Sequence, residues 1–346
     1  MSRKVKIGNL TIGGGEKIAV QSMSTLKISD VGAAAEQAQR LKAAGCDILR
    51  FSVQTEADAK AFKEVKKRAG IPLVADIHFD YRLAIAAIEG GADKIRINPG
   101  NIGGEDKVKK VADALKAAGI PVRVGSNTGS LDKEFLRKYG KNEISLGESA
   151  LKNAAWLEKY GVHDVVLSVK ASSVPLTVKA YEYVAAKADY PLHVGVTEAG
   201  TEYNGVIKNA VALGALLLKG IGDTVRVSLS ADPEREIVAA KSILSAAGLY
   251  KNRAEVIACP TCGRCEWNCM EFAKKTEEYV KNVVKPVKIA VMGCVVNGPG
   301  EAADADLGVA GGKDGCVIFS GGKILKKVKE EELERAFFGE IDRWLS

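Results

Sequence analysis

The stretch KIRINPGNIGGEDKVKKVADALKAAGIPVRVGSN, residues 94–127, contains the unit from which most of this sequence is built. Its two ends are short runs rich in Ile and Val, as buried β-strands are. Between them, residues 105–119 space their apolar side chains as a helix does and end in glycine, a common helix C-terminus. The stretch therefore predicts a strand, a helix and a second strand.

The same unit recurs through the first 250 residues. Strand-like runs begin near residues 18, 47, 72, 94, 121, 164, 191 and 224, with Ala-, Glu-, Lys- and Leu-rich helical segments between them. Eight such units are the number expected for a TIM-like (β/α)8 barrel. A doubly wound open sheet is the alternative. It normally has fewer strands, however, and no GxGxxG motif follows the first strand.

The pattern changes near residue 251. Helical spacing over residues 266–285 is followed by the strand VKIAVMGC, by the segments LGVAGG and GCVIFSGGKILKKV with a Gly-Gly turn, and by the amphipathic helix EEELERAFFGEIDRWL. We therefore expect two domains, a barrel over residues 1–250 and a small α+β domain over residues 251–346. All the clustered cysteines lie in the second.

Composition narrows the class of protein. The 346 residues are 47% hydrophobic, with no run long enough for a signal peptide or a membrane span. We therefore expect a cytoplasmic protein that is not bound to a membrane. Seven cysteines, an odd number, favour thiol or metal chemistry over a disulfide framework. The net charge of +7 indicates only that anionic partners are plausible.

Polar side chains gather at the late positions of the predicted strands. Two of them often stand an even number of residues apart, so that both point to one face. These pairs are Arg50 and Ser52, Asp76 and His78, Arg96 and Asn98, Arg123 and Asn127, Ser168 and Lys170, and Arg226 and Ser228. Four arginines and a lysine should meet at the barrel mouth, where catalytic residues of this fold lie. Their mutual repulsion predicts a polyanionic ligand, and phosphate groups fit guanidinium best.

A less specific interpretation pairs these cations with barrel carboxylates such as Asp76 and Glu198. It explains one arginine more easily than five basic residues from five units. His78 shares a face with Asp76 and could bind substrate, and Glu198 is either a proton donor or an arginine partner. His163 and His193 lie before a strand or early in one, so we expect both to be structural.

The cysteines cluster in CPTCGRCEWNC, residues 259–269. Their spacing matches the run with which bacterial ferredoxins bind a [4Fe–4S] cluster. The match is imperfect, because Pro260 follows the first cysteine and no second run exists. A four-cysteine zinc site is the alternative. Further on, GCVVNGPGEA places Cys294 at a strand end, before an expected tight Gly-Pro-Gly loop and Glu301.

Several segments together resemble one family. They are RINPGNIG, ADIHFDYR, LSVKAS, TEAG, RVSL, ACPTCGR and GCVVNGPGEA, spread over almost the whole chain. They are similar to the bacterial 4-hydroxy-3-methylbut-2-enyl diphosphate synthases of the non-mevalonate isoprenoid pathway. The resemblance implies a TIM-like barrel joined to a cluster domain. It also implies a two-electron reductive ring opening of 2-C-methyl-D-erythritol 2,4-cyclodiphosphate, with loss of a hydroxyl group as water.

The resemblance also implies ligands for a [4Fe–4S] cluster. They are Cys259, Cys262, Cys294 and Glu301. A carboxylate is a harder and more labile iron ligand than a thiolate, so the Glu301 corner can open for substrate. Cys265 and Cys269 depart from the family pattern, and we expect packed thiols there rather than alternative ligands. Cys46 and Cys316 are expected to be structural as well.

The substrate residues follow from the barrel mouth. We expect Arg50, Arg96, Arg123 and Lys170 to hold the diphosphate, with Asn98, Asn127, Arg226 and Ser228 completing its hydrogen bonds. The candidate catalytic residues are Asp76, His78, Glu198 and Glu301. Reduced flavodoxin or ferredoxin is the expected electron donor.

A homodimer is expected for a geometric reason. Helices that follow barrel strands run back toward the amino-terminal side, so the linker near residue 251 should leave the barrel opposite its mouth. A second chain can place its cluster domain over that mouth, and the resemblance implies this arrangement too. One alternative is a zinc-dependent nucleic-acid-binding protein, although only 6% of the residues are aromatic. The other is a pterin- or corrinoid-linked barrel enzyme, which gives no reason for a cluster domain.

Overall fold

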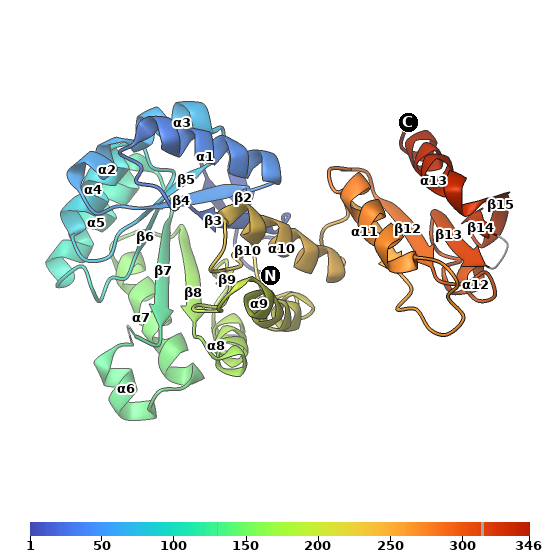
Figure 1. Ribbon diagram of the computed structural model, residues 1–346. Coiled ribbons are helices and arrows are strands. Elements are labelled where there is room, and N and C mark those ends of the chain that lie inside the picture. Colours follow the sequence, from blue (N-terminus) through green and yellow to red (C-terminus); the bar gives the residue numbers. More distant parts are fainter. Residues whose placement is uncertain (130, 313–314) are drawn as a thin grey trace. The chain divides into compact units, whose positions relative to one another are not determined.

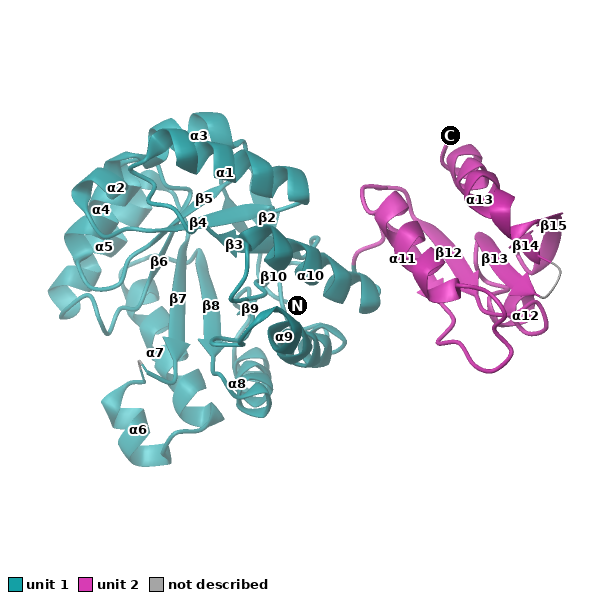
Figure 2. Ribbon diagram, in the orientation of Figure 1, with its two compact units in different colours: residues 1–249 teal, residues 250–346 magenta. Residues whose placement is uncertain are grey.

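The chain divides into two compact units in a computed structural model that describes residues 1–129, 131–312 and 315–346. Unit 1 comprises residues 1–249 and unit 2 residues 250–346 (Figures 1 and 2). The division falls one residue before the boundary expected from the sequence. Among the described residues, no helix is long and apolar enough to cross a membrane.

Unit 1 is a parallel eight-stranded barrel surrounded by helices (Figure 1). The order of hydrogen-bonded strands is β8-β7-β6-β5-β4-β3-β10-β9. A parallel bridge between Leu167 and Leu192 joins the two ends of this row, with the Leu167 N–H 2.9 Å from the Pro191 carbonyl oxygen. The TIM-like barrel predicted from the sequence is confirmed.

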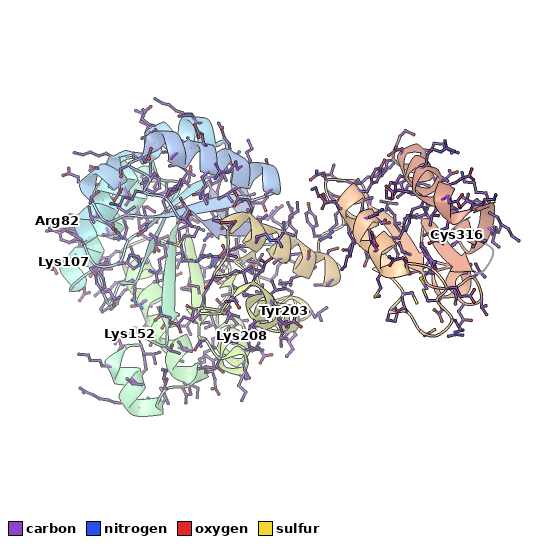
Figure 3. All side chains as sticks on the ribbon, viewed as in Figure 1. Arg82, Lys107, Lys152, Tyr203, Lys208 and Cys316 are labelled. Carbon is purple, nitrogen blue, oxygen red and sulfur yellow. The ribbon has the colours of Figure 1, made fainter. Side chains whose placement is uncertain are left out.

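All eight barrel strands fall on the runs named from the sequence. The strands are β3 (Ala19–Met23), β4 (Ile48–Ser52), β5 (Leu73–Asp76), β6 (Lys94–Ile97), β7 (Val122–Asn127), β8 (Val165–Lys170), β9 (His193–Val194) and β10 (Thr224–Val225). The helices around them are α1 (Val31–Ala44), α2 (Glu56–Lys60), α3 (Phe62–Ala69), α4 (Tyr81–Glu89), α5 (Glu105–Ala118), α6 (Lys133–Tyr139), α7 (Glu143–Lys159), α8 (Val174–Lys187), α9 (Glu202–Leu217) and α10 (Pro233–Ala246). Side chains such as Arg82, Lys107 and Tyr203 project from the outside of this ring (Figure 3).

Local sequence sets where these helices begin and end. The Asp30 carboxylate accepts the Ala33 N–H at the start of α1, and Gly45 ends that helix in the left-handed conformation. Gly119 ends α5 in the same way. Each reversal returns the chain to the amino-terminal side of the barrel, where the next strand starts.

An N-terminal hairpin closes the amino-terminal end of the barrel. Its strands β1 (Val5–Ile7) and β2 (Leu10–Ile12) pair antiparallel. They bury apolar side chains against the first residues of the barrel strands, including Ala19 and Ile48. The polar strand ends therefore lie at the other opening.

Unit 2 is a mixed five-stranded sheet, in the order β11-β12-β13-β14-β15. Its elements are β11 (Ala254–Ala258), α11 (Cys269–Val280), β12 (Val287–Met292), α12 (Gly298–Glu301), β13 (Leu307–Gly312), β14 (Gly315–Ser320), β15 (Lys323–Val328) and α13 (Glu330–Leu345). One core joins the sheet to both α11 and α13, for example through Phe272 and Phe337. Cys316, on β14, belongs to this core (Figure 3).

Three details of unit 2 differ from the sequence-based expectation. Strand β11, parallel to β12, was not anticipated, and α11 is shorter than the helix expected over residues 266–285. The tight loop expected at Gly-Pro-Gly is the single helical turn α12, which proline favours in its first turn. Gly298 opens that turn, and a Cβ there would lie 2.8 Å from the Met292 Cβ, so only glycine packs this closely.

Candidate functional site

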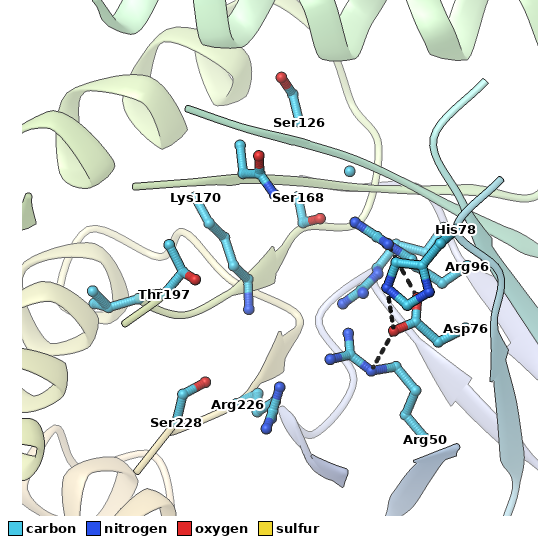
Figure 4. Close-up of a pocket in the computed structure, with 14 residues that line it drawn as sticks. Arg50, Asp76, His78, Arg96, Ser126, Ser168, Lys170, Thr197, Arg226 and Ser228 are labelled. Carbon is cyan, nitrogen blue, oxygen red and sulfur yellow. Dashed lines mark hydrogen bonds and ion pairs between the residues drawn. The ribbon is translucent and has the colours of Figure 1, made fainter. Parts of the chain in front are cut away.

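A polar pocket opens at the carboxyl ends of the barrel strands (Figure 4). It is lined by Arg50, Asp76, His78, Arg96, Arg123, Gly125, Ser126, Asn127, Ser168, Lys170, Val196, Thr197, Arg226 and Ser228. These residues come from seven of the eight barrel strands or the segments that directly follow them. Five side chains are cationic and one is a carboxylate, so the pocket carries an excess of positive charge.

Asp76 organises one side of the pocket. Its carboxylate oxygens lie 3.1 Å from Arg96 Nη1, 3.6 Å from Arg50 Nε and 3.8 Å from His78 Nε2 (Figure 4). Burial alone would raise the pKa of Asp76, but the guanidinium groups of Arg50, Arg96 and Arg123 outweigh it and hold the pKa at about 2. Asp76 is therefore ionised at neutral pH and fixes the arginines around it.

Arg226 Nη2 lies 3.4 Å from the buried Glu236 carboxylate, but Arg123 and Lys170 have less compensation for their charge. Arg123 is 2% exposed, and within the described residues its Nε and Nη1 have no hydrogen-bond partner. Burial lowers the pKa of Arg123 and of Lys170 well below their ordinary values, and the neighbouring arginines lower both further. An anion that enters the pocket would supply the missing acceptors and offset this repulsion.

Glycines make room for the polar groups. A Cβ at Gly125 would lie 2.8 Å from Ser168 Oγ and 3.6 Å from Arg96 Nη2. A Cβ at Gly195 would lie 2.8 Å from Lys170 Nζ. Any larger residue at either position would displace a side chain of the pocket.

Three residues expected at the mouth, Ser52, Asn98 and Glu198, do not line this pocket. Asn98 is buried, and its Oδ1 accepts hydrogen bonds from the Gly100 N–H at 3.1 Å and from Asn153 Nδ2 at 3.4 Å, so it shapes the loop after β6. Glu198 is exposed just beyond Thr197, and its backbone φ is 55°, in the left-handed region.

The pocket also contains groups that sequence reasoning missed. Ser126 and Thr197 line it, although neither was named from the strand pattern. Thr197 stands an even number of residues after His193, so the same alternation could have found it. Ser126 could not be found in this way, because it lies between Arg123 and Asn127 at a position that the alternation assigns to the other face.

His163 and His193 were expected to be structural. His193 is fully buried, with its Nδ1 2.7 Å from Thr224 Oγ1, and burial lowers its pKa well below the ordinary value. Neither histidine lines the pocket at the mouth.

A second group of reactive side chains lies at the strand ends of unit 2. Cys259 directly follows β11, and Cys294 lies two residues after β12. Because these strands are parallel neighbours, their carboxyl ends lie side by side, and the Cys259 N–H donates to the Val291 carbonyl oxygen at 2.9 Å. The glycine between them in space, Gly293, leaves room for sulfur, since its Cβ would lie 3.4 Å from the Cys259 Sγ.

Arg264 links the remaining groups. Its guanidinium hydrogen-bonds the Cys262 thiol and lowers the pKa of that thiol. The hydrogen bond with Cys262 raises the pKa of Arg264, and the charges of Cys294 and Glu301 raise it further. Arg264 was not singled out from the sequence.

The expected ligands, three thiols and a carboxylate, have the donor chemistry of an iron–sulfur cluster, which takes one ligand at each iron. Across the described parts of the chain, no group of three or more His, Cys, Asp or Glu side chains converges on one point that could hold a metal ion. The Thr261 N–H, 3.4 Å from the Cys259 Sγ, is a hydrogen bond of the kind that surrounds cluster thiolates. Its donor, Thr261, has a left-handed φ of 63°, rare for a β-branched residue.

The other cysteines differ in burial. Cys46, Cys269 and Cys316 are buried free thiols, and burial raises the pKa of each. Cys265 is half-buried. No disulfide joins any of the seven cysteines, all of which lie in the described residues.

Comparison with known proteins covers both units. Residues 2–241 match the GcpE TIM-barrel domain, and residues 255–343 match the GcpE protein C-terminal domain. The chain is 54% identical over 344 residues to 4-hydroxy-3-methylbut-2-en-1-yl diphosphate synthase (flavodoxin) of Caldanaerobacter subterraneus subsp. tengcongensis, covering 99% of this chain and 97% of that protein. The enzyme of the same name from Bacillus subtilis (strain 168) is 51% identical over 342 residues, covering 99% and 91%.

Two solved structures are similar to part of this chain. Dihydropteroate synthase of Yersinia pestis gives a TM-score of 0.51 at 12% identity, covering 72% of this chain and all of that one. Type I 3-dehydroquinate dehydratase of Clostridium difficile gives 0.51 at 17% identity, covering 71% and 97%. At these identities the likeness shows a shared barrel fold and says nothing of activity.

Proposed function

The chain belongs to the GcpE family, and we propose that it divides the reaction of that family between its two units. The reaction is the reductive ring opening of 2-C-methyl-D-erythritol 2,4-cyclodiphosphate to 4-hydroxy-3-methylbut-2-enyl diphosphate, with loss of a hydroxyl group as water. We assign substrate binding to the barrel mouth and the supply of two electrons to a [4Fe–4S] cluster held by unit 2.

The assignment of substrate binding to the barrel mouth rests on the charge of its pocket. Five cationic side chains from different strands line one pocket, and a single carboxylate lies among them. A cyclic diphosphate is the kind of polyanion that such a pocket stabilises, because each guanidinium can donate two parallel hydrogen bonds to phosphate oxygens.

Each pocket residue then has a role. Arg123 and Lys170 contribute the least compensated charges and bind phosphate directly. Arg50 and Arg96 bind it in orientations fixed by Asp76. The remaining hydrogen bonds come from Asn127, Arg226 and Ser228, while Asn98 contributes by holding the loop after β6.

A proton must reach the hydroxyl group that leaves as water. Asp76 is ionised at neutral pH, so we assign it a positioning role. His78 and Glu198 are then the two groups at the mouth that can carry the proton. His78 lines the pocket, and Glu198 stands at its rim on a strained backbone.

The cluster is assigned to Cys259, Cys262, Cys294 and Glu301. When bound, it supplies electrons and an iron that acts as a Lewis acid toward the substrate. The Thr261 N–H and the Arg264 guanidinium orient the thiolates and offset their negative charge. Glu301 is exposed and accepts a hydrogen bond from Asn297 Nδ2 at 3.3 Å, so this ligand is held more loosely than Cys259.

The electron donor is part of the proposal. The relatives of this chain carry flavodoxin in their names, and we assign reduced flavodoxin, or ferredoxin, to this chain as well. Seven free thiols support a reducing compartment, and we therefore place the enzyme in the cytoplasm.

A homodimer with shared active sites completes the proposal. Lys241 of α10 donates to the Ala44 carbonyl oxygen at the end of α1, 3.2 Å away. The last barrel helix thus runs toward the amino-terminal side, and the chain leaves unit 1 at the opening opposite the pocket. A partner chain can bring its own cluster to the mouth.

Mixing two inactive variants tests this arrangement. Combining Arg123→Ala chains with Cys294→Ser chains should restore about a quarter of the parent activity, because half of the randomly mixed dimers are heterodimers and each has one intact site. Subunit exchange would be shown independently with a mass label. Exchange without any rescue would place both halves of the site in one chain.

Substrate binding tests the assignment of the mouth itself. Arg123→Ala should weaken binding of the cyclic diphosphate by about 1.5 to 3 kcal/mol, measured by calorimetry on anaerobically purified protein. Arg82→Ala is the matched control, because Arg82 is exposed and pairs with Asp80 on its own helix turn (Figure 3). Equal affinity in the two folded variants would contradict the assignment.

A further inference from the structure

Cys265 stands among the cysteines of unit 2 without a role in the proposed function. It lies in the segment between β11 and α11, three residues after Cys262, and its N–H donates to the Cys262 carbonyl oxygen at 3.0 Å. This turn keeps the two cysteines next to each other. The spacing of two intervening residues is the one found in iron–sulfur and zinc sites.

The Cys265 sulfur lies beside an expected cluster ligand. A Cβ on Gly293 would be 3.3 Å from the Cys265 Sγ and 3.4 Å from the Cys259 Sγ. The two sulfur atoms are therefore no more than about 7 Å apart, the sum of these distances. Gly293 directly precedes Cys294, so the Cys265 sulfur lies near the chain segment that carries a further expected ligand.

The contacts of the Cys265 sulfur are weak ones. It lies 3.3 Å from the Trp267 carbonyl oxygen, and the Cys269 thiol hydrogen-bonds it. Thiol hydrogen bonds of this kind are easily exchanged for a metal–sulfur bond. Cys269 differs, because it is buried in the core of unit 2.

The weakest of the expected ligands is the carboxylate. Glu301 is exposed, ends the single turn α12 and is held by Asn297. Iron in a sulfide cluster binds thiolate more strongly than carboxylate. A thiol near the cluster thus competes with Glu301 for the fourth iron.

We propose that Cys265 is a reserve ligand of the cluster, which binds the fourth iron as a thiolate when the Glu301 carboxylate leaves it. This inference rests on the ligand set given under the proposed function. In the exchange one iron–oxygen bond breaks and one iron–sulfur bond forms. The thiol proton passes to the released carboxylate or to water, and no electrons are transferred.

The exchange has two consequences for the enzyme. With four thiolates the cluster keeps all its irons but offers no open site, so this form is intact and inactive. Return of Glu301 restores the open corner. Cys265 would thereby keep the fourth iron in place whenever Glu301 leaves the corner and no substrate has bound there.

Removal of Glu301 tests the proposal through iron content. Glu301→Ala should keep about four irons per chain because Cys265 takes the empty corner, and Glu301→Ala/Cys265→Ser should fall to about three. Iron and sulfide assays and the EPR spectra of four- and three-iron clusters provide the measurements. The matched control Glu301→Ala/Cys269→Ala should keep about four.

Alkylation provides a second measurement that needs no double variant. In the parent holoenzyme iodoacetamide should modify Cys265, whereas in Glu301→Ala it should be protected, as peptide mass spectrometry would show. Loss of the fourth iron in Glu301→Ala itself, or equal alkylation of Cys265 in both proteins, would overturn the proposal. Iron loss in Cys265→Ser with Glu301 present would also overturn it, because Cys265 would then be a permanent ligand.

The proposed set of cluster ligands can be tested independently of the reserve role of Cys265. If Cys294→Ser binds as much iron as the parent, the proposed cluster site is wrong, whatever Cys265 does. If Cys294→Ser loses its cluster while Glu301→Ala drops to three irons, the site is right and only the reserve role fails.

Discussion

The barrel mouth and the cysteine group of unit 2 hold their chemistry in different ways. At the mouth, Arg50, Asp76 and Arg123 extend from strands and are nine-tenths or more buried, and Asp76 holds Arg50. In unit 2, Cys262 and Glu301 are exposed, Cys262 between two elements and Glu301 at the end of the single turn α12. The mouth is thus largely organised without a ligand, whereas the proposed cluster would have to organise the segments that hold it.

The backbone shows one property common to both regions. Within the described chain, Glu198 and Thr261 are the two non-glycine residues with positive φ; Glu198 follows the pocket residue Thr197, and Thr261 lies between Cys259 and Cys262. Strain of this kind persists only where the surroundings impose it, and it is common at functional sites. It supports the roles proposed for both segments.

The largest expected effect comes from removing one of the proposed cluster ligands of unit 2. Cys294→Ser should lose most of its bound iron and its brown colour, with turnover reduced about 100-fold or more, and Cys259→Ser and Cys262→Ser should behave alike. Iron assays and visible absorption provide the measurement. Cys316→Ala is the control, because this thiol is buried on β14, and comparable iron loss there would indicate general unfolding instead.

A second substitution separates binding of the proposed cluster from catalytic turnover. Glu301→Cys should keep the iron–sulfur absorption but lose most turnover, by about tenfold or more, because a fourth thiolate closes the open iron. Turnover of the cyclic diphosphate with reduced flavodoxin measures this. Full activity in the variant would mean that the glutamate corner need not open.

The ion pairs of Asp76 at the mouth should make the free energy of unfolding depend on pH. Burial would raise the pKa of Asp76, but its arginines hold it at about 2, below the ordinary 3.8, so the ionised carboxylate stabilises the fold above pH 4. This contribution, about 2 kcal/mol, disappears as the pH falls through 2. Asp76→Asn lacks it, so the difference in unfolding free energy between parent and variant should shrink by that amount from pH 6 to pH 2. Urea unfolding of cluster-free protein measures it, and a constant difference would contradict the assignment.

The smallest effect concerns space at the mouth. Gly125→Ala should weaken binding of the cyclic diphosphate a few-fold, about 1 kcal/mol, because the new methyl group displaces Ser168 Oγ. Gly214→Ala, on α9, is the control, since a Cβ there meets nothing within 4 Å. Titration calorimetry compares the affinities of the two variants. Equal affinities would show that the pocket side chains move aside for the methyl group, and that the mouth is no more rigid than the cysteine segments of unit 2.

Burial explains which parts of the fold could be predicted. The barrel strands are buried on both faces, so each appears in the sequence as a continuous apolar run. Such a run can be recognised without knowing which strand it pairs with. Strand β11 has only Ala254 buried and gives no such run. The hairpin strands β1 and β2 have three residues each, too short for any period to show.

Site residues could be predicted from the sequence only where they follow the two-residue alternation of a β-strand. Arg96 is the third residue of β6 and Arg123 the second of β7, and both lie on the strand face that lines the pocket. The alternation also placed Asn98 on the face of Arg96, but β6 ends at Ile97. Asn98 and Glu198 both lie beyond the strand ends, and neither lines the pocket. Cys265 was expected to pack as an ordinary thiol, because nothing in the spacing shows that Gly293, 28 residues later, brings its sulfur to Cys259.

The hairpin β1–β2 has a kinetic consequence. It fills the amino-terminal end of the barrel with Val5, Ile7 and Ile12, which leaves the opening at the strand ends for the ligands of the mouth. If the mouth binds the cyclic diphosphate as proposed, the linear diphosphate product, which carries the same phosphate groups, would occupy the same cations. Product would then have to leave before the next substrate enters, and its inhibition should be competitive with the cyclic diphosphate.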